Sequence, residues 1–391
     1  MVLWLIALSG ALWWLLQAVC IMRTLRAVRP LPAGQVDTPI ESGPLVSVIC
    51  PARNEADAIE AATRTRLADP EPWMEFVFVD DRSDDATADI LERVCVHEPR
   101  ARVIRNVTLP EGWLGKVHAQ QIGLEHAQVR EQGWYLFSDG DTHVLPGAVA
   151  SAIAWAECEQ AEHVAMTPRM VGGPLVLRLC LAPLMRVLIC TLRLWLANDD
   201  DQPRAMGVGA FNLVRRSALE RAGGLEQLRL EIADDVGLAQ IIKDAGGRSR
   251  SAIGAQWVEI EWYRTTGQFL RGAEKGVAKA RTRMGIAVSG LLGILLIAID
   301  ISPLVMLVWW PAPWALLAAA TVAMATALSV MLAMSFGLPR WWSLLWPLGA
   351  VAGLLITLRS MALALIRGGV QWRGDTHTLA STSEGERVRL S

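Results

Sequence analysis

Trp134-Tyr135-Leu136-Phe137-Ser138-Asp139-Gly140-Asp141 is the run that decides the fold of this chain. Its apolar half predicts a buried strand, and its second half places two carboxylates one residue apart where that strand ends. Residues at i and i+2 of a strand point to the same face, so both side chains can reach one hard divalent cation, which prefers oxygen ligands. Alone, such an acidic pair is more often a solvated turn. The surrounding sequence is therefore needed to distinguish a metal site from a solvated turn.

Two earlier apolar runs also end in polar segments. The run Leu45–Cys50 leads into Pro51-Ala52-Arg53-Asn54-Glu55, and the run Glu75–Val79 leads into Asp80-Asp81-Arg82-Ser83-Asp84-Asp85-Ala86-Thr87. Helical periodicity begins at Ala56 and again at Ala88. This alternation predicts an α/β sheet domain over residues 44–284. Ligands of open α/β sheets bind outside the carboxyl ends of the strands, so the three polar segments point to one crevice.

The order of these motifs resembles the family 2 glycosyltransferases. Over residues 44–275 the chain carries Pro-x-x-Asn-Glu, then Asp-Asp-x-Ser-x-Asp-x-Thr, then Gly115-Lys116, then Asp-x-Asp. Further on, Gly207–Asn212 is similar to the acceptor-side loop of that family, and Ala233-Asp234-Asp235 to its acidic pair at the start of a helix. The resemblance implies a GT-A fold, a Rossmann-like domain that binds a nucleotide sugar.

A last motif, Gln268-Phe269-Leu270-Arg271-Gly272, resembles the Gln-x-x-Arg-Trp motif of the membrane-bound branch. Gly272 stands where that branch has tryptophan, which argues against a processive polysaccharide synthase. Asp234 stands where glutamate is common, a chemically mild change.

The resemblance implies a role for each motif residue. The residues implied in binding the donor diphosphate and nucleoside are Pro51, Asn54, Glu55, Asp80, Asp81, Lys116, Asp139, Gln268 and Arg271. Asp139 and Asp141 are expected to hold Mg²⁺ or Mn²⁺, and Gly209, Asn212 and Asp234 to lie on the acceptor side. Asp235 is the expected general base, because inversion by direct displacement needs one carboxylate to take the proton of the acceptor hydroxyl.

Several of these residues also have a structural interpretation. Asp81, Ser83 and Asp84 are good helix caps, and so are Asp234 and Asp235. Lys116 could be an ordinary surface lysine, and Arg271 an arginine that snorkels to a membrane surface. His143, two residues after Asp141, could contact the metal or a phosphate, or be a plain loop histidine.

Both ends of the chain are apolar. Val2–Met22 carries no charge and matches the roughly 20 residues needed to cross a bilayer. Arg23, Arg26 and Arg29 follow it, whereas a cleaved signal peptide carries its charge before the apolar run. Residues 1–30 are therefore predicted to be a membrane anchor with a basic flank, and the positive-inside rule places the next segment in the cytoplasm.

Residues 285–366 predict about three more spans, near 286–309, 314–336 and 341–364. Asp300 and Arg359 interrupt two of them, and a charge inside a span generally faces protein or water. We expect these charges to line a helix bundle or to snorkel near a membrane surface, rather than to form a proton or ion path. The polar tail, 367–391, lies outside if there are three crossings, whereas its arginines favour the inside.

The stretch 171–196 is apolar but contains Arg178, Arg186 and Arg193. Spacings of eight and seven residues place all three on one helical face, which predicts an amphipathic helix in the membrane surface. The alternative is a core helix with three solvated arginines.

Composition narrows the function further. The six cysteines have no zinc-site spacing, and a net charge of −2 without a basic run argues against a nucleic-acid partner.

The sequence predicts a multi-pass protein of the cell (inner) membrane with a cytoplasmic catalytic domain. It would transfer one sugar from a nucleotide-sugar donor, preferably a UDP-sugar, to a lipid hydroxyl of the bilayer. The layout resembles hopene-associated and ceramide-glucosyltransferase-like enzymes, which implies a hopanoid or sphingolipid-like acceptor, with carotenoids and glycerolipids next. A polyprenyl-phosphate sugar transferase and a catalytically silent scaffold are the alternatives.

Overall fold

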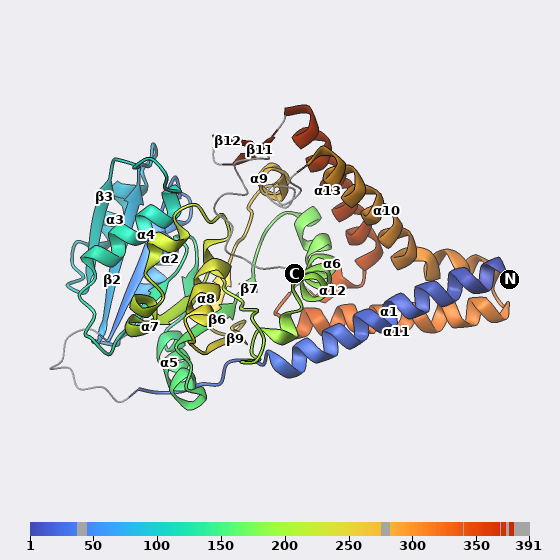
Figure 1. The fold of residues 1–391 in the computed structure, drawn as a ribbon, viewed down its shortest axis with the longest axis horizontal. Coiled ribbons are helices and arrows are strands. Elements are labelled where there is room, and N and C mark those ends of the chain that lie inside the picture. Colours follow the sequence, from blue (N-terminus) through green and yellow to red (C-terminus); the bar gives the residue numbers. More distant parts are fainter. Residues whose placement is uncertain (37–44, 275–281, 339, 368, 373–374, 379–391) are drawn as a thin grey trace. The chain divides into compact units, whose positions relative to one another are not determined.

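The structure is a computed structural model that describes residues 1–36, 45–274, 282–338, 340–367, 369–372 and 375–378 (Figure 1). The chain divides into two compact units, each described by itself. The sheet unit comprises Ala27–Arg169 and Leu196–Glu261, and the helical unit comprises Met1–Arg26, Met170–Trp195 and the described part of Trp262–Glu384. The predicted domain 44–284 is therefore larger than the sheet unit, because 170–195, 262–274 and 282–284 group with the apolar helices.

The sheet unit is built on seven strands in the order β3-β2-β1-β4-β8-β6-β9. Strands β1 to β4 are parallel, β8 is antiparallel to both β4 and β6, and β6 is parallel to β9. The strand bounds are β1 Val46–Ala52, β2 Met74–Asp81, β3 Ala101–Asn106, β4 Trp134–Phe137, β6 His163–Thr167, β8 Asn212–Arg215 and β9 Ser249–Ile253. Shorter strands are β5 His143–Val144, β7 Arg169–Met170 and β10 Val258–Ile260. The predicted α/β sheet domain is confirmed.

Helices cover both faces of this sheet. Along β1, Val48 and Cys50 pack into one hydrophobic cluster while Ile49 packs into another, as alternation along a strand requires. Helices α2 (Ile59–Leu67), α3 (Thr87–Cys95) and α5 (Ala148–Glu159) complete the first cluster. Helices α4 (Gly115–His126), α7 (Arg216–Arg221) and α8 (Asp234–Asp244) complete the second. Every residue of β1 and β2 is buried, because a sheet covered on both faces leaves no polar side.

Two strands run further than the sequence predicts. β1 continues through Pro51 and Ala52, which pair with Val79 and Asp80, so Asp80 and Asp81 are strand residues rather than turn residues. Helix α2 begins at Ile59 instead of Ala56. Residues 56–58 form a turn before it, in which the Ala56 N–H donates to the Asp85 carboxylate at 3.1 Å.

The helical unit contains five helices that are long and apolar enough to cross a membrane, among the described residues. They are α1 Val2–Ala27, α6 Leu175–Leu192, α10 Arg283–Met306 continued by the 3-10 turn Leu307–Trp309, α11 Pro313–Ser335 and α13 Trp346–Arg367. Shorter elements are α9 Thr266–Gly272, α12 Arg340–Ser343 and the hairpin β11 Gly369–Trp372 with β12 Asp375–Thr378. Residues 379–391 of the predicted polar tail lie outside the described residues.

A buried ion pair joins three of these helices. Arg186 of α6 donates two hydrogen bonds of 3.1 Å to the Asp300 carboxylate of α10, and both side chains are almost fully buried. Trp13 and Gln17 of α1 donate to the same carboxylate at 2.9 and 3.0 Å. The Arg186 guanidinium also lies 4.3 Å from the centre of the Trp14 ring. Asp300 thus lines the helix bundle, as expected.

The helix around 171–196 differs from the prediction. Arg186 does not share a polar face with Arg178 and Arg193, because it turns inward to the carboxylate on α10. Arg193 lies beyond the helix end as its left-handed cap, and Arg178 binds the carbonyl oxygens of Gly172 and Gly173. The prediction of three arginines on one solvated face is wrong.

Candidate functional site

The three polar segments lie at one edge of the sheet. β1 is flanked by β2 and β4 and runs parallel to both. Parallel neighbours end on the same side, so the segments 51–55, 80–87 and 138–141 meet there. The loop before β8 joins them, because the Asp139 N–H donates to the Gly209 carbonyl at 2.9 Å.

Lys116 lies among carboxylates at this edge. Its Nζ is 2.7 Å from Asp139 Oδ1 and 3.1 Å from Asp234 Oδ2, and the side chain is 18% exposed. Burial works against the charge, but the attraction of Asp139, Asp234 and Asp235 raises the pKa of Lys116 above its usual value. Lys116 is therefore a charged member of the site and not a surface lysine.

Asp235 occupies the first turn of α8. Its Oδ2 accepts a hydrogen bond of 2.9 Å from the Gly209 N–H, and its Oδ1 accepts one of 2.9 Å from the Val236 N–H. Burial and the adjacent charge of Asp234 raise the pKa of Asp235. Asp234 itself is buried, bound by Lys116 and by Gln120 Nε2 at 3.1 Å. Asp234 therefore holds Lys116, and its acceptor-side role stays a prediction.

Two glycines let the loop before β8 approach these carboxylates. A Cβ on Gly209 would lie 2.6 Å from Asp139 Oδ2 and 3.2 Å from Lys116 Nζ. A Cβ on Gly207 would overlap the Asp235 carbonyl. Gly209 thus belongs to the site because it has no side chain.

Asn212 supports Asp235 from β8. It is buried, its Nδ2 donates to the Asp235 carbonyl at 3.0 Å, and its Oδ1 accepts from His163 Nε2 at 2.7 Å. His163 Nδ1 in turn accepts from the Ser249 hydroxyl at 2.8 Å. Both polar atoms of Asn212 are used inside the protein, so its acceptor-side role also stays a prediction. Sequence reasoning missed His163.

Asp80 and Asp81 differ in their partners. Asp81 Oδ1 accepts from Arg82 Nε at 2.8 Å and from Asn106 Nδ2 at 2.9 Å. Asp80 is buried, and its Oδ1 has no hydrogen-bond partner among the described residues. A buried acceptor without a donor is costly, so Asp80 is the better candidate for a ligand contact at the nucleoside end.

The segment after β1 is held by the segment after β2. Asn54 has a positive φ of 54°, and its Oδ1 accepts from the Asp84 N–H at 2.8 Å. The Glu55 N–H donates to Thr87 Oγ1 at 2.9 Å. Asp85 accepts from the Thr87 N–H at 2.9 Å, so Asp85 binds the start of α3 where Asp81, Ser83 or Asp84 were the expected caps. Pro51, Asn54 and Glu55 thus shape the site edge, and their donor contacts stay predictions.

Gln268 and Arg271 belong to α9 of the helical unit. Gln268 forms a capping box with Thr265: Thr265 Oγ1 accepts from the Gln268 N–H, and Gln268 Oε1 accepts from the Thr265 N–H, both at 3.2 Å. The Tyr263 ring lies where a side chain on Gly272 would begin, which explains the glycine in place of tryptophan. Donor binding by Gln268 and Arg271 stays a prediction.

The carboxylates of Asp139 and Asp141 suit a hard divalent cation. Burial and the neighbouring charge of Asp139 raise the pKa of Asp141 to about 6, as expected for two carboxylates crowded together. Oxygen donors are what Mg²⁺ and Mn²⁺ prefer. Within the described residues no group of three or more His, Cys, Asp or Glu is already arranged around one point, so a bound ion would complete its shell with other ligands. His143 binds Thr65, with 2.9 Å between His143 Nδ1 and Thr65 Oγ1.

Two comparisons with known proteins find matches for this chain. Residues 47–186 match the family model described as Glycosyl transferase family 2. The chain carries a glycosyltransferase domain. Its structure is similar to that of the mannosyltransferase PcManGT from Pyrobaculum calidifontis in complex with GDP-Man and Mn²⁺, with a TM-score of 0.50, 20% identity, and coverage of 91% of this chain and 99% of that chain. This likeness confirms the predicted GT-A fold.

A second similar structure is that of GalNAc-T7 with UDP, GalNAc and Mn²⁺. It has a TM-score of 0.39 and 14% identity, and the match covers 60% of this chain and 48% of that chain. No curated protein matches the chain.

The close approach of Gly209 gives a first prediction for this glycosyltransferase. Gly209→Ala would press its Cβ on Asp139 and displace the carboxylate by a fraction of an ångström to an ångström, so we expect the rate of sugar transfer to fall by roughly 10²-fold. Gly353→Ala in α13 is the matched control, because a Cβ there meets nothing within 4 Å. The initial rates of both variants are the measurement, and an unchanged rate in Gly209→Ala would contradict the tight packing.

His163 gives a prediction about pH. Burial lowers the pKa of His163 to about 4, while in the unfolded chain it is 6.5. Between these values only the unfolded state takes up the proton, so stability falls as pH falls from 6.5 and the loss, about 3 kcal/mol, is complete near pH 4. His163→Gln keeps a donor and an acceptor without titrating. Denaturant midpoints from pH 7 to 4 should therefore fall less in the variant, and equal slopes would exclude His163 as the cause.

Proposed function

We propose that this glycosyltransferase moves one sugar, with inversion, from a nucleotide-sugar donor to a hydroxyl of a membrane lipid. The observation that carries the proposal is Lys116 held between Asp139 and Asp234 at the carboxyl edge of the sheet. The five helices able to span a bilayer support a lipid acceptor, because they would bring the enzyme to a substrate that stays in the membrane.

Each residue of the edge has a proposed task. Asp139 and Asp141 would hold Mg²⁺ or Mn²⁺, which when bound neutralises charge on the leaving diphosphate. Lys116 would offer a point charge to the same diphosphate, and Asp80 would accept a hydrogen bond from the nucleoside. Asp235 would take the proton of the acceptor hydroxyl, and its raised pKa suits a base that works near neutral pH.

We further propose that the sheet unit faces the cytoplasm of a multi-pass inner-membrane protein. Arg23 and Arg26 lie in the last turns of α1, and positive residues beside a span favour the cytoplasmic side. The overall layout is the basis for hopanoid or sphingolipid-like acceptors, with carotenoid and glycerolipid hydroxyls next. UDP-sugars are the preferred donors, and GDP-mannose joins the test panel because PcManGT is described with GDP-Man.

The test uses membranes that contain the full chain, a panel of labelled nucleotide sugars, and Mg²⁺, Mn²⁺ or EDTA. We expect metal-dependent label in the organic phase with one donor, and loss of that label in Asp139→Asn/Asp141→Asn. Asp89→Asn is the matched control, since Asp89 is 76% exposed on α3. Folded protein that neither transfers label nor binds a nucleoside diphosphate with Mn²⁺ would favour the silent scaffold.

One observation favours a second candidate, transfer to a polyprenyl phosphate. Both carboxylate oxygens of Asp235 accept backbone N–H groups, so Asp235 also anchors the Gly209 loop. A phosphate acceptor is already ionised and needs no strong base. Asp235→Asn separates the two candidates, because only hydroxyl transfer depends on proton removal.

A further inference from the structure

We propose that the C-terminal end of α2 positions the metal-holding loop and that Arg66 is its main positioning residue. The inference rests on the proposed function, in which Asp139 and Asp141 hold the cation. In this proposal the Arg66 side chain touches neither the substrate nor the metal. It acts by fixing the backbone that carries the Asp139 and Asp141 carboxylates.

Arg66 binds the loop at three points. Its Nη1 donates to the Gly140 carbonyl at 3.2 Å, and its Nη2 donates to Ser138 Oγ at 3.2 Å and to the Asp139 carbonyl. Ser138 Oγ passes the restraint on, because it donates to the Ala210 carbonyl at 2.8 Å. One guanidinium therefore fixes the loop and, through Ser138, the segment that includes Gly209.

Burial makes this arrangement expensive. Arg66 is 2% exposed, and within the described residues no carboxylate lies within ion-pair distance of it. A buried charge is costly unless it is paired or its donors are satisfied. A nearby opposite charge is that of Asp141, whose pKa is raised by burial and lowered by the charge of Arg66. Here Nη1 and Nη2 are satisfied by the loop, whereas Nε has no partner among the described residues. The buried guanidinium therefore uses its terminal donors in hydrogen bonds to the loop 138–140.

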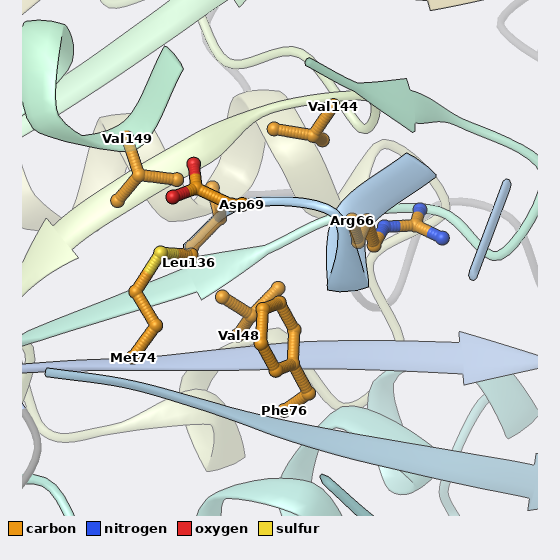
Figure 2. A pocket seen from close by; sticks show the side chains of 8 residues that line it. All are labelled: Val48, Arg66, Asp69, Met74, Phe76, Leu136, Val144 and Val149. Atoms are coloured by element: carbon orange, nitrogen blue, oxygen red, sulfur yellow. The ribbon is translucent and has the colours of Figure 1, made fainter. Parts of the chain in front are cut away.

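The surroundings of Arg66 argue against a simple filling role. A cavity of about 10 Å³ lies beside it, lined mainly by apolar side chains such as Met74, Phe76 and Val149 (Figure 2). In Figure 2 the guanidinium points away from Met74 and Val149. An unbranched apolar side chain would fill this space at a lower desolvation cost than arginine.

Neighbouring side chains of α2 hold the far end of the loop. Thr65 Oγ1 lies 2.9 Å from His143 Nδ1, and just beyond α2 Asp69 Oδ2 accepts from the Gly147 N–H at 2.9 Å. Together with Arg66 they restrain the backbone from 138 to 147. Supporting groups of this kind typically change metal affinity by about 10- to 100-fold when they are removed.

The experiment measures Mn²⁺ affinity directly. The purified full chain in detergent is titrated with Mn²⁺ and followed by electron paramagnetic resonance, with UDP and in parallel with GDP. We expect Arg66→Met to weaken Mn²⁺ binding by about 10- to 100-fold and Arg66→Lys by less, because lysine keeps the charge but not the forked geometry. Arg64→Met is the matched control, since Arg64 is 61% exposed on the same helix.

The outcomes separate the two proposals. Wild-type affinity in folded Arg66→Met overturns the positioning role while the proposed function stands. A wild-type chain that binds no Mn²⁺ with either nucleotide overturns the metal role of Asp139 and Asp141, and this inference with it. If Arg66→Met does not fold, Thr65→Val decides: it should weaken Mn²⁺ binding several-fold with an unchanged melting temperature, and unchanged affinity overturns the proposal.

Discussion

Asp235→Asn is expected to lower kcat for transfer to a lipid hydroxyl by about 10²- to 10⁴-fold, the usual contribution of a positioned base. Asparagine has the size of aspartate but cannot accept the proton. It keeps one carbonyl oxygen for the Gly209 N–H, the contact made by Asp235 Oδ2 at 2.9 Å. It loses only the acceptor of the Val236 N–H, which lies in the first turn of α8, where N–H groups have no partner within the helix. We therefore expect the loss in kcat, measured at saturating donor, while nucleotide affinity changes little.

Two controls make this prediction specific. Asp244→Asn is the same change at the exposed last residue of α8 and should leave the rate unchanged. The melting temperature and the affinity for UDP or GDP report any disturbance of the Gly209 loop. A folded Asp235→Asn that keeps kcat would contradict a base at this position and favour a phosphate acceptor.

The sequence predicts the sheet well where the signal is local. Trp134–Phe137 is a strand with the bounds expected, and the segments after β1, β2 and β4 meet at one edge because parallel neighbours share that edge. The antiparallel β8 between β4 and β6 was not predicted. Its position depends on pairing between residues 47 to 81 apart along the chain, and no short pattern in the sequence records such a pairing.

The same distinction applies to the site. The motifs name Lys116, Asp139 and Asp235, and the structure places them together. Arg66 was missed, although a signal exists: it lies on the buried stripe of α2 with Ile59, Ala62 and Thr63. An arginine on an apolar stripe needs a partner, and only the fold shows that the partner is the backbone of the Asp139 loop.

Arg186 in the helical unit is a second arginine whose partner could not be predicted from the sequence. Its spacing to Arg178 and Arg193 predicts a solvated face, yet its partner, Asp300, is 114 residues away along the chain. Helical periodicity describes only the side of a helix on which a residue lies. It does not distinguish water from a carboxylate on another helix.

The buried ion pair between Arg186 and Asp300 gives the second prediction with a large expected effect, a loss of stability. Asp300→Leu should destabilise the helical unit by about 3 to 5 kcal/mol, because Arg186 then remains buried without its counter-charge. Trp13 and Gln17 also lose their acceptor, so the contacts of α1 weaken as well. The measurement is the unfolding midpoint in detergent, followed by tryptophan fluorescence.

The double variant Arg186→Met/Asp300→Leu tests the cause. Removing both charges removes the desolvation cost along with the attraction, and replacing a buried ion pair by apolar residues is often neutral or stabilising. We therefore expect the double variant to recover most of the loss of Asp300→Leu. Gln17→Leu removes a donor to Asp300 and an acceptor of Arg186 Nη1 but no charge, so it should cost less than Asp300→Leu, about 1.5 to 3 kcal/mol. If the double variant is as unstable as Asp300→Leu, the unpaired charge is not the cause, and the loss comes instead from the tryptophan and glutamine contacts of α1.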